Sequence, residues 1–170
     1  MAYSSIQAYD AVIIGAGAAG LMCAIEAGKR GRRVLVLERA ERIGKKILIS
    51  GGGRCNFTNL HTTAENFISA NPHFAKSALA RYTPADFVKL VQKHRIAHHE
   101  KKLGQLFCDR SANDIVAMLE EECRAARVEI RVNTTIREVR PGKPLFTVAA
   151  DQGSDHIMFS APRLAMAAGG

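Results

Sequence analysis

The chain has 170 residues, of which 47% are hydrophobic and 24% are charged. This composition is typical of a folded globular protein and excludes the disordered and collagenous classes. No apolar run approaches the roughly 20 residues that cross a bilayer, and the first residues lack the pattern of a secretory signal. The cysteines have no metal-finger or CxxC spacing, which suits a reducing compartment. We therefore expect a cytoplasmic protein with no membrane partner.

The formal net charge of +8 is concentrated in one segment. Nine basic and two acidic residues between Lys29 and Arg54 give that segment a net charge of +7, whereas the rest of the chain has a net charge of +1. A local positive field suits a ligand that carries phosphate, although a solvated loop would have the same composition. We expect a small-molecule substrate and no nucleic-acid partner, because little basic surface remains outside this segment.

The N-terminal part predicts a strand, a helix and a second strand. Residues 10–15 form an apolar run that ends in glycine, residues 18–30 have helical composition, and residues 33–38 form another apolar run. Gly31 is a plausible end of the helix. Continuous apolar runs favour strands buried on both faces of a parallel sheet. We expect a right-handed βαβ unit.

Periodicity is lost between residues 43 and 59, where four glycines predict a long irregular loop. Capping and periodicity signals define the elements that follow. These are a helix opening at Thr83-Pro84, a hairpin with strands 100–102 and 105–108, a helix from Ser111 to about Ala126, and strands at 128–132, 135–139, 146–150, 156–159 and 164–168.

The first strand and the first helix enclose a G-x-G-x-x-G motif, Gly15-Ala-Gly17-Ala-Ala-Gly20. In this context Gly15 permits a tight turn, Gly17 lets the backbone approach a pyrophosphate, and Gly20 allows close packing. The pyrophosphate would rest on amides at the helix N-terminus, those of Ala18 and Ala19 included. A glycine-rich turn that binds no ligand is the alternative.

Glu38 ends the second strand, 18 residues after Gly20. A carboxylate at this point accepts hydrogen bonds from the ribose hydroxyls of an adenosine. It would repel a 2′-phosphate, which argues against NADP in this site. FAD and NAD share the motif, so the motif alone leaves the choice between them open.

A second signature follows, reading G-x-K-x-x-x-S-G-G-G-R-C-N-x-T-N from Gly44 to Asn59. It resembles the signature of the BaiN/YhiN-like bacterial flavoproteins, which are NAD(P)/FAD-dependent, aminoacetone-oxidase-like oxidoreductases. The resemblance covers the whole chain and includes the closing Ala-Gly-Gly, although Ala168 replaces a threonine that is usual in the family.

The resemblance implies a Rossmann-like FAD-binding α/β domain of the glutathione-reductase-like class, with a parallel sheet and an added antiparallel β-meander. It implies FAD as cofactor and NAD(P)H as a candidate electron donor. Residues 1–170 would form the N-terminal FAD-binding domain of a longer two-domain flavoprotein, incomplete at its C-terminus. The residues expected at the cofactor are Gly15, Gly17, Ala18, Ala19, Gly20, Glu38, Arg39, Lys45, Lys46, Ser50, Gly51, Gly52, Gly53, Arg54, Cys55, Asn56 and Gly169.

The leading hypothesis is an FAD-binding oxidoreductase whose flavin accepts hydride from NAD(P)H or from a small organic substrate. The alternatives are an NAD-dependent dehydrogenase, a flavoprotein that acts on tRNA, and a truncated chain without activity. No catalytic residue is predicted. Cys55 is expected to have a packing rather than a redox role, and a metal site formed by His94 and His98 on one helix is disfavoured.

Overall fold

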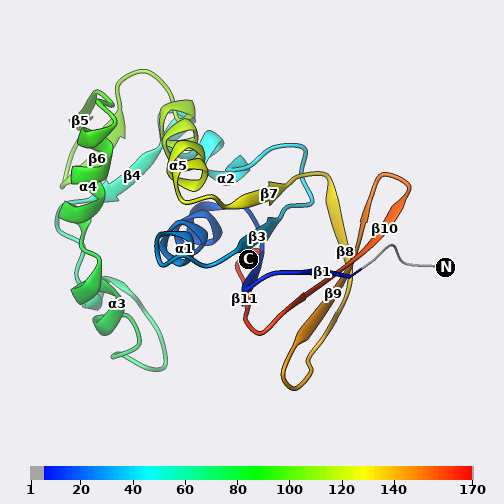
Figure 1. Cartoon of the computed structure of the whole chain (residues 1–170). Coiled ribbons are helices and arrows are strands. Elements are labelled where there is room, and N and C mark those ends of the chain that lie inside the picture. The colour runs from blue at the N-terminus through cyan, green and yellow to red at the C-terminus, as the bar shows by residue number, and fades with distance from the viewer. Residues whose placement is uncertain (1–5, 170) are drawn as a thin grey trace. The chain divides into compact units, whose positions relative to one another are not determined.

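The computed structural model describes residues 6–169. The chain divides into two compact units (Figure 1). We call Met1–Lys46 together with Leu119–Gly170 the parallel-sheet unit, and Ile47–Met118 the inserted unit. Helices α2 (Lys45–Ile49) and α5 (Asn113–Ala125) cross the two boundaries in the sequence.

The parallel-sheet unit is built on four parallel strands in the order β11-β2-β3-β7. Helix α1 joins β2 to β3 and packs against both strands. Gly31 follows the C-cap residue Arg30 of this helix, and its φ of +74° suits a residue without a side chain. This is the predicted βαβ unit. The bounds are β2 Ala11–Ile14, α1 Ala18–Lys29, β3 Val34–Leu37, β7 Glu129–Arg131 and β11 Leu164–Met166.

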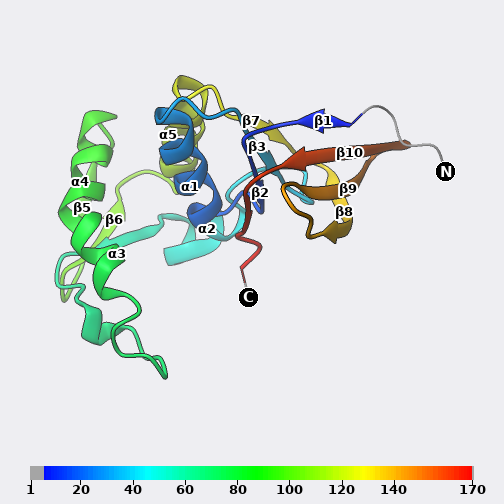
Figure 2. The ribbon, with the colours of Figure 1, turned by 60° about the horizontal axis from the view of Figure 1, so that its bottom comes forward.

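A second sheet of the same unit has the order β1-β10-β9-β8, in which β8, β9 and β10 form the expected antiparallel meander (Figure 2). Strand β1 adds to its edge, parallel to β10. The bounds are β1 Gln7–Ala8, β8 Thr134–Arg140, β9 Phe146–Gln152 and β10 Asp155–Ala161.

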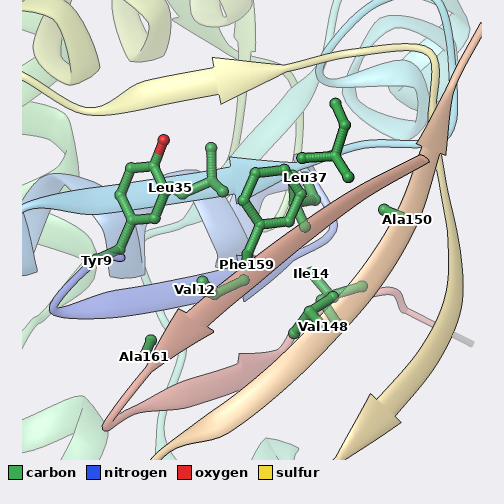
Figure 3. Packing of buried hydrophobic residues seen from close by; sticks show 10 residues of the cluster. Tyr9, Val12, Ile14, Leu35, Leu37, Val148, Ala150, Phe159 and Ala161 are labelled. Atoms are coloured by element: carbon green, nitrogen blue, oxygen red, sulfur yellow. The ribbon is translucent and has the colours of Figure 1, made fainter. Parts of the chain in front are cut away.

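The core of this unit lies between the two sheets (Figure 3). Alternate residues of β2 and β3 point toward Val148 of β9 and Phe159 of β10. The other residues of these strands, such as Ile13 and Val36, are also buried. Burial on both faces explains why the strands read as continuous apolar runs. The result is a Rossmann-type α/β fold, as the family resemblance implied.

The inserted unit holds a three-stranded antiparallel sheet of order β4-β6-β5 and two helices, α3 and α4. Helix α4 begins at the predicted Thr83-Pro84, where Thr83 and Asp86 form a capping box. The bounds are β4 Asn56–Asn59, α3 Lys76–Arg81, α4 Pro84–Lys93, β5 His98–Glu100 and β6 Gln105–Cys108. No helix within residues 6–169 is long and apolar enough to cross a membrane.

One expectation from the sequence is wrong. The segment 43–59 is not an irregular loop, because it contains α2, a 3-10 turn over Ser50–Gly53 and strand β4. Strand β4 exists through pairing with β6, a partner distant in the sequence. His94 and His98 do not share a helix, because α4 ends before His94 and His98 begins β5. Strand β1 and helix α3 were not predicted.

Candidate cofactor site

The glycine motif forms the turn between β2 and α1, and two of its glycines are required by packing. A Cβ atom on Gly15 would lie 2.4 Å from the carbonyl oxygen of Ala167, and φ at Gly15 is +106°. A Cβ atom on Gly20 would lie 1.9 Å from the carbonyl oxygen of Gly15. Both distances are far below van der Waals contact, so neither position accommodates a side chain without movement of the backbone.

Gly17 differs from its two neighbours in the motif. Its backbone is extended, with φ −81° and ψ −176°, and no atom lies within 4 Å of the place where a Cβ would stand. The protein itself therefore does not require glycine here. A ligand that passes close to the backbone would require it, as a pyrophosphate does in dinucleotide-binding turns.

Hydrogen-bond donors face the same turn. The first intrahelical bond of α1 joins the amide of Leu21 to the carbonyl of Gly17 at 3.0 Å. The amides of Ala18, Ala19 and Gly20 precede this bond, and no side chain caps the helix. Ala18 and Ala19 are exposed. This helix end therefore offers amide donors and the positive end of the helix dipole to an anion.

The carboxylate of Glu38 closes the turn from the end of β3. Its Oε2 accepts a hydrogen bond from the amide of Ala16 at 2.8 Å, and its Oε1 accepts one from the amide of Ala40 at 2.8 Å. Each carboxylate oxygen has a further lone pair that a ribose hydroxyl could use. The sequence predicted the ribose role but missed that Glu38 also fixes the glycine turn.

The ends of three parallel strands meet at this turn. The amide of Ala167, after β11, donates to Ile14 at 2.8 Å, and the amide of Gly44 donates to Ala16 at 2.8 Å. A Cβ atom on Gly169 would lie 3.1 Å from Nζ of Lys46. Ligands of open α/β sheets bind outside the carboxyl ends of the strands. Gly169 and Lys46 are therefore well placed for a role at the cofactor.

Two other predicted cations lie on the surface. Lys45 forms an ion pair with Glu41 at 3.0 Å, whereas Nζ of Lys46 lies beside Gly169. Arg39 is exposed and follows Glu38 directly. The open space at Gly17, the uncapped amides of α1 and the carboxylate of Glu38 together fit the adenosine and pyrophosphate parts of FAD.

The remaining predicted cofactor residues lie in the inserted unit, in the glycine turn that follows α2. Gly51 and Gly52 have left-handed backbones, with φ of +58° and +66°. The amides of Arg54 and Cys55 both donate to the carbonyl oxygen of Ser50. These two amides are therefore committed to closing the turn.

Side chains of this turn are also used locally. The hydroxyl of Ser50 donates to the carbonyl oxygen of Ile47 at 2.9 Å. The side-chain nitrogen of Asn56 donates to the carbonyl oxygens of Thr58 at 3.1 Å and Leu106 at 3.3 Å. Gly53 accepts a bond from the amide of Ala112 at 2.7 Å. The signature residues thus build the turn and its junction with β4.

Cys55 is buried, with 5% of its surface exposed. Burial raises the pKa of its thiol, and a hydrogen bond with Ser50 offsets only part of this rise. Cys108 is also buried, and burial together with the nearby Cys55 raises its pKa to about 12. Thiols with raised pKa are poor nucleophiles, which agrees with the packing role expected for Cys55.

The inserted unit also has a pocket of about 240 Å³ that the sequence did not predict. It lies beside the glycine turn, and His99, Lys101 and Phe107 of the β5–β6 hairpin line it together with Gly51, Gly52 and Arg54. Because the pairing of β4 with β6 was not predicted, nothing in the sequence joined Arg54 to this hairpin. Within residues 6–169, no group of three or more His, Cys, Asp or Glu side chains could hold a metal ion.

Comparison with known proteins agrees with this geometry. The chain is 53% identical over 143 residues to a ribosomal RNA dihydrouridine synthase of Escherichia coli (strain K12), which covers 84% of this chain and 36% of that protein. It is 32% identical over 162 residues to a 3-dehydro-bile acid delta(4,6)-reductase of Clostridium scindens, which covers 93% of this chain and 38% of that protein. The chain thus spans little more than a third of the length of these relatives.

Among solved structures, glycine oxidase from Geobacillus kaustophilus superposes with a TM-score of 0.69 at 18% identity, covering 96% of this chain and 56% of that one. This likeness shows the fold alone. The family model described as HI0933-like protein Rossmann domain matches residues 9–170. The chain therefore belongs to the HI0933-like Rossmann domain family of FAD-binding flavoproteins.

Proposed function

We propose that this chain is the FAD-binding part of a flavin-dependent reductase that saturates a carbon–carbon double bond, with uridine in ribosomal RNA as its substrate. The observation that carries the proposal is the 53% identity to the E. coli synthase, over a segment whose glycine turn and Glu38 fit a dinucleotide. The expectation of no nucleic-acid partner came from the charge count alone, and the proposal departs from it.

The chemistry of the two relatives supports a reductase. Dihydrouridine is uridine whose C5=C6 bond has been reduced, and the name of the steroid enzyme also describes reduction of double bonds. Reduction of this bond adds one hydride and one proton, and we propose that NAD(P)H supplies the hydride and becomes NAD(P)⁺. The likeness to glycine oxidase extends only to the fold, so amine oxidation has no comparable support.

The residues of the parallel-sheet unit have defined tasks in this proposal. The amides of Ala18 and Ala19 would hold the pyrophosphate, the bare backbone at Gly17 would let it approach, and Glu38 would bind the ribose. Lys46 would add positive charge beside Gly169. FAD, when bound, supplies hydride transfer. All four cysteines are free, which supports a cytoplasmic location.

The test is a chimera in which this chain replaces the matching N-terminal segment of the E. coli synthase. The chimera is expressed in E. coli cells that lack their own enzyme, and rRNA nucleosides are then measured by mass spectrometry. We expect dihydrouridine to return, and to be lost again in the Gly17→Val chimera. A chimera that binds FAD and leaves rRNA unmodified contradicts the proposed substrate. A chimera without bound flavin contradicts the cofactor assignment.

A further inference from the structure

The pocket in the inserted unit carries positive charge that the protein does not neutralise. Arg54 and Lys101 both line it, and within residues 6–169 neither forms an ion pair with a carboxylate. Other cations of the chain do have carboxylate partners, for example Lys29 with Glu122 and Arg110 with Asp114. Two unpaired cations at one pocket favour an anionic ligand.

The acidic residues near the pocket are engaged elsewhere. Asp109 accepts a hydrogen bond from Nδ1 of His99 at 2.6 Å, which leaves Nε2 of His99 as the free ring nitrogen. Glu100 accepts a bond from the amide of Gly104 at 2.9 Å. Asp109 therefore orients His99 and forms no ion pair with Arg54 or Lys101.

One aromatic ring contacts two of the side chains that line the pocket, those of His99 and Lys101. Phe107 is 8% exposed, the ring of His99 stacks with it at a centroid distance of 6.4 Å, and Nζ of Lys101 lies 5.3 Å from its centroid. A Cβ atom on Gly51 would come within 2.7 Å of the same ring. A lysine held against a ring, as Lys101 is, loses less conformational entropy on binding than a free surface lysine does.

The size of the pocket limits its ligand. At about 240 Å³ it is smaller than the roughly 300–1,000 Å³ of sites that enclose a drug-sized molecule. It would hold a single phosphate group but not a dinucleotide. The pyrophosphate of FAD already has the uncapped amides of α1 and the open space at Gly17 in the parallel-sheet unit. A phosphate of the nucleic-acid substrate is therefore the better match.

We infer that Arg54 and Lys101 bind a backbone phosphate of the substrate RNA in the pocket that His99 and Phe107 also line. This inference rests on the proposed function, because it takes RNA as the substrate. It assigns Arg54 to RNA, although its signature implied a role at the cofactor. The planar guanidinium of Arg54 can bind a phosphate with two hydrogen bonds, and Lys101 adds a point charge. The site reads phosphate and not sequence.

The test compares Lys101→Gln with the matched control Lys102→Gln in the 170-residue chain loaded with FAD. Both lysines are exposed and adjacent, but only Lys101 lines the pocket. The affinity for single-stranded oligouridylate is measured by fluorescence anisotropy over a range of salt concentrations. Each phosphate contact contributes about −0.7 to the slope of log K against log salt for a single strand. We expect Lys101→Gln to make the slope shallower by about that amount and Lys102→Gln to leave it close to wild type.

Binding of FAD, followed by flavin fluorescence, separates the two sources of phosphate. We expect the FAD affinity of Lys101→Gln to equal that of the wild type. A loss of FAD affinity with an unchanged RNA slope would assign the pocket to the cofactor and overturn the inference. So would equal slopes for the two variants, or an absence of salt-dependent RNA binding by the wild type.

Failure of the proposed function would look different from failure of this inference. A chimera that makes no dihydrouridine, together with a salt slope that depends on Lys101, would remove the proposed reaction and keep the phosphate site. A chimera that restores dihydrouridine, together with equal slopes for Lys101→Gln and Lys102→Gln, would keep the reaction and remove the site.

Discussion

Replacement of Glu38 by alanine removes the carboxylate that joins the glycine turn to the end of β3. Two backbone amides, those of Ala16 and Ala40, lose their acceptors, which lie at 2.8 Å in both cases. The free chain should therefore lose stability even without a cofactor. A role confined to the ribose would predict no such loss, because the ribose is absent from the free chain.

The expected magnitude follows from these two bonds. A hydrogen bond to a charged acceptor stabilises a protein by about 1.5–3 kcal/mol. Glu38 is only partly buried, so water can reach the two amides in the variant and reduce the loss. We expect Glu38→Ala to lower the free energy of unfolding by about 1–3 kcal/mol. Glu38→Gln keeps one acceptor oxygen and should lose less.

The assays are urea unfolding of the free chain, followed by circular dichroism, and titration with FAD, followed by flavin fluorescence. Glu41→Ala is the matched control, because Glu41 lies on the same loop and forms an ion pair with the exposed Lys45. It should leave both measurements close to wild type. An unchanged unfolding curve for Glu38→Ala would refute the structural role of Glu38, and an unchanged FAD affinity would refute its ribose role.

Three further predictions concern glycines, cysteines and one aspartate. Gly17→Val should abolish FAD binding while the free energy of unfolding stays within about 0.5 kcal/mol of wild type. Gly20→Ala should destabilise the free chain by about 1–3 kcal/mol, because the added Cβ would lie 1.9 Å from a carbonyl oxygen. Equal melting curves for the two variants would contradict this difference. Iodoacetamide should label the exposed Cys23 in the native chain at about pH 8 and label Cys108 only in urea, because burial raises the pKa of Cys108 to about 12. The hydrogen bond from the N-cap Thr83 lowers the pKa of Asp86 to about 2. The stabilisation of α4 by ionised Asp86 should therefore be complete above the unfolded pKa of about 3.9 and be lost as the pH falls through about 2. An NMR titration of Asp86 with a midpoint near 4 would refute this prediction.

Local signals in the sequence were enough for the strands and the helix that frame the glycine motif. Strands buried on both faces read as apolar runs, so β2 and β3 could be predicted without knowledge of their neighbours. The motif at Gly15, Gly17 and Gly20 lies between them, and the chain length from Gly20 to Glu38 matches one helix and one strand. The predicted βαβ unit rests on these short-range patterns, and the family resemblance extended it to the confirmed Rossmann-type fold.

Tertiary structure decided what depends on distant pairing. The segment before β4 has no period of its own, and β4 forms only because β6 supplies its hydrogen bonds. The same pairing brings Arg54 to one pocket with His99 and Lys101, although the charge count along the sequence had assigned Arg54 to a separate basic segment. Likewise, the hydrogen bond from the amide of Ala16 to Glu38 depends on the folded chain, which brings the glycine turn to the end of β3. A sequence fixes local conformation through backbone preferences and burial, whereas the grouping of charges depends on contacts that only the folded chain makes.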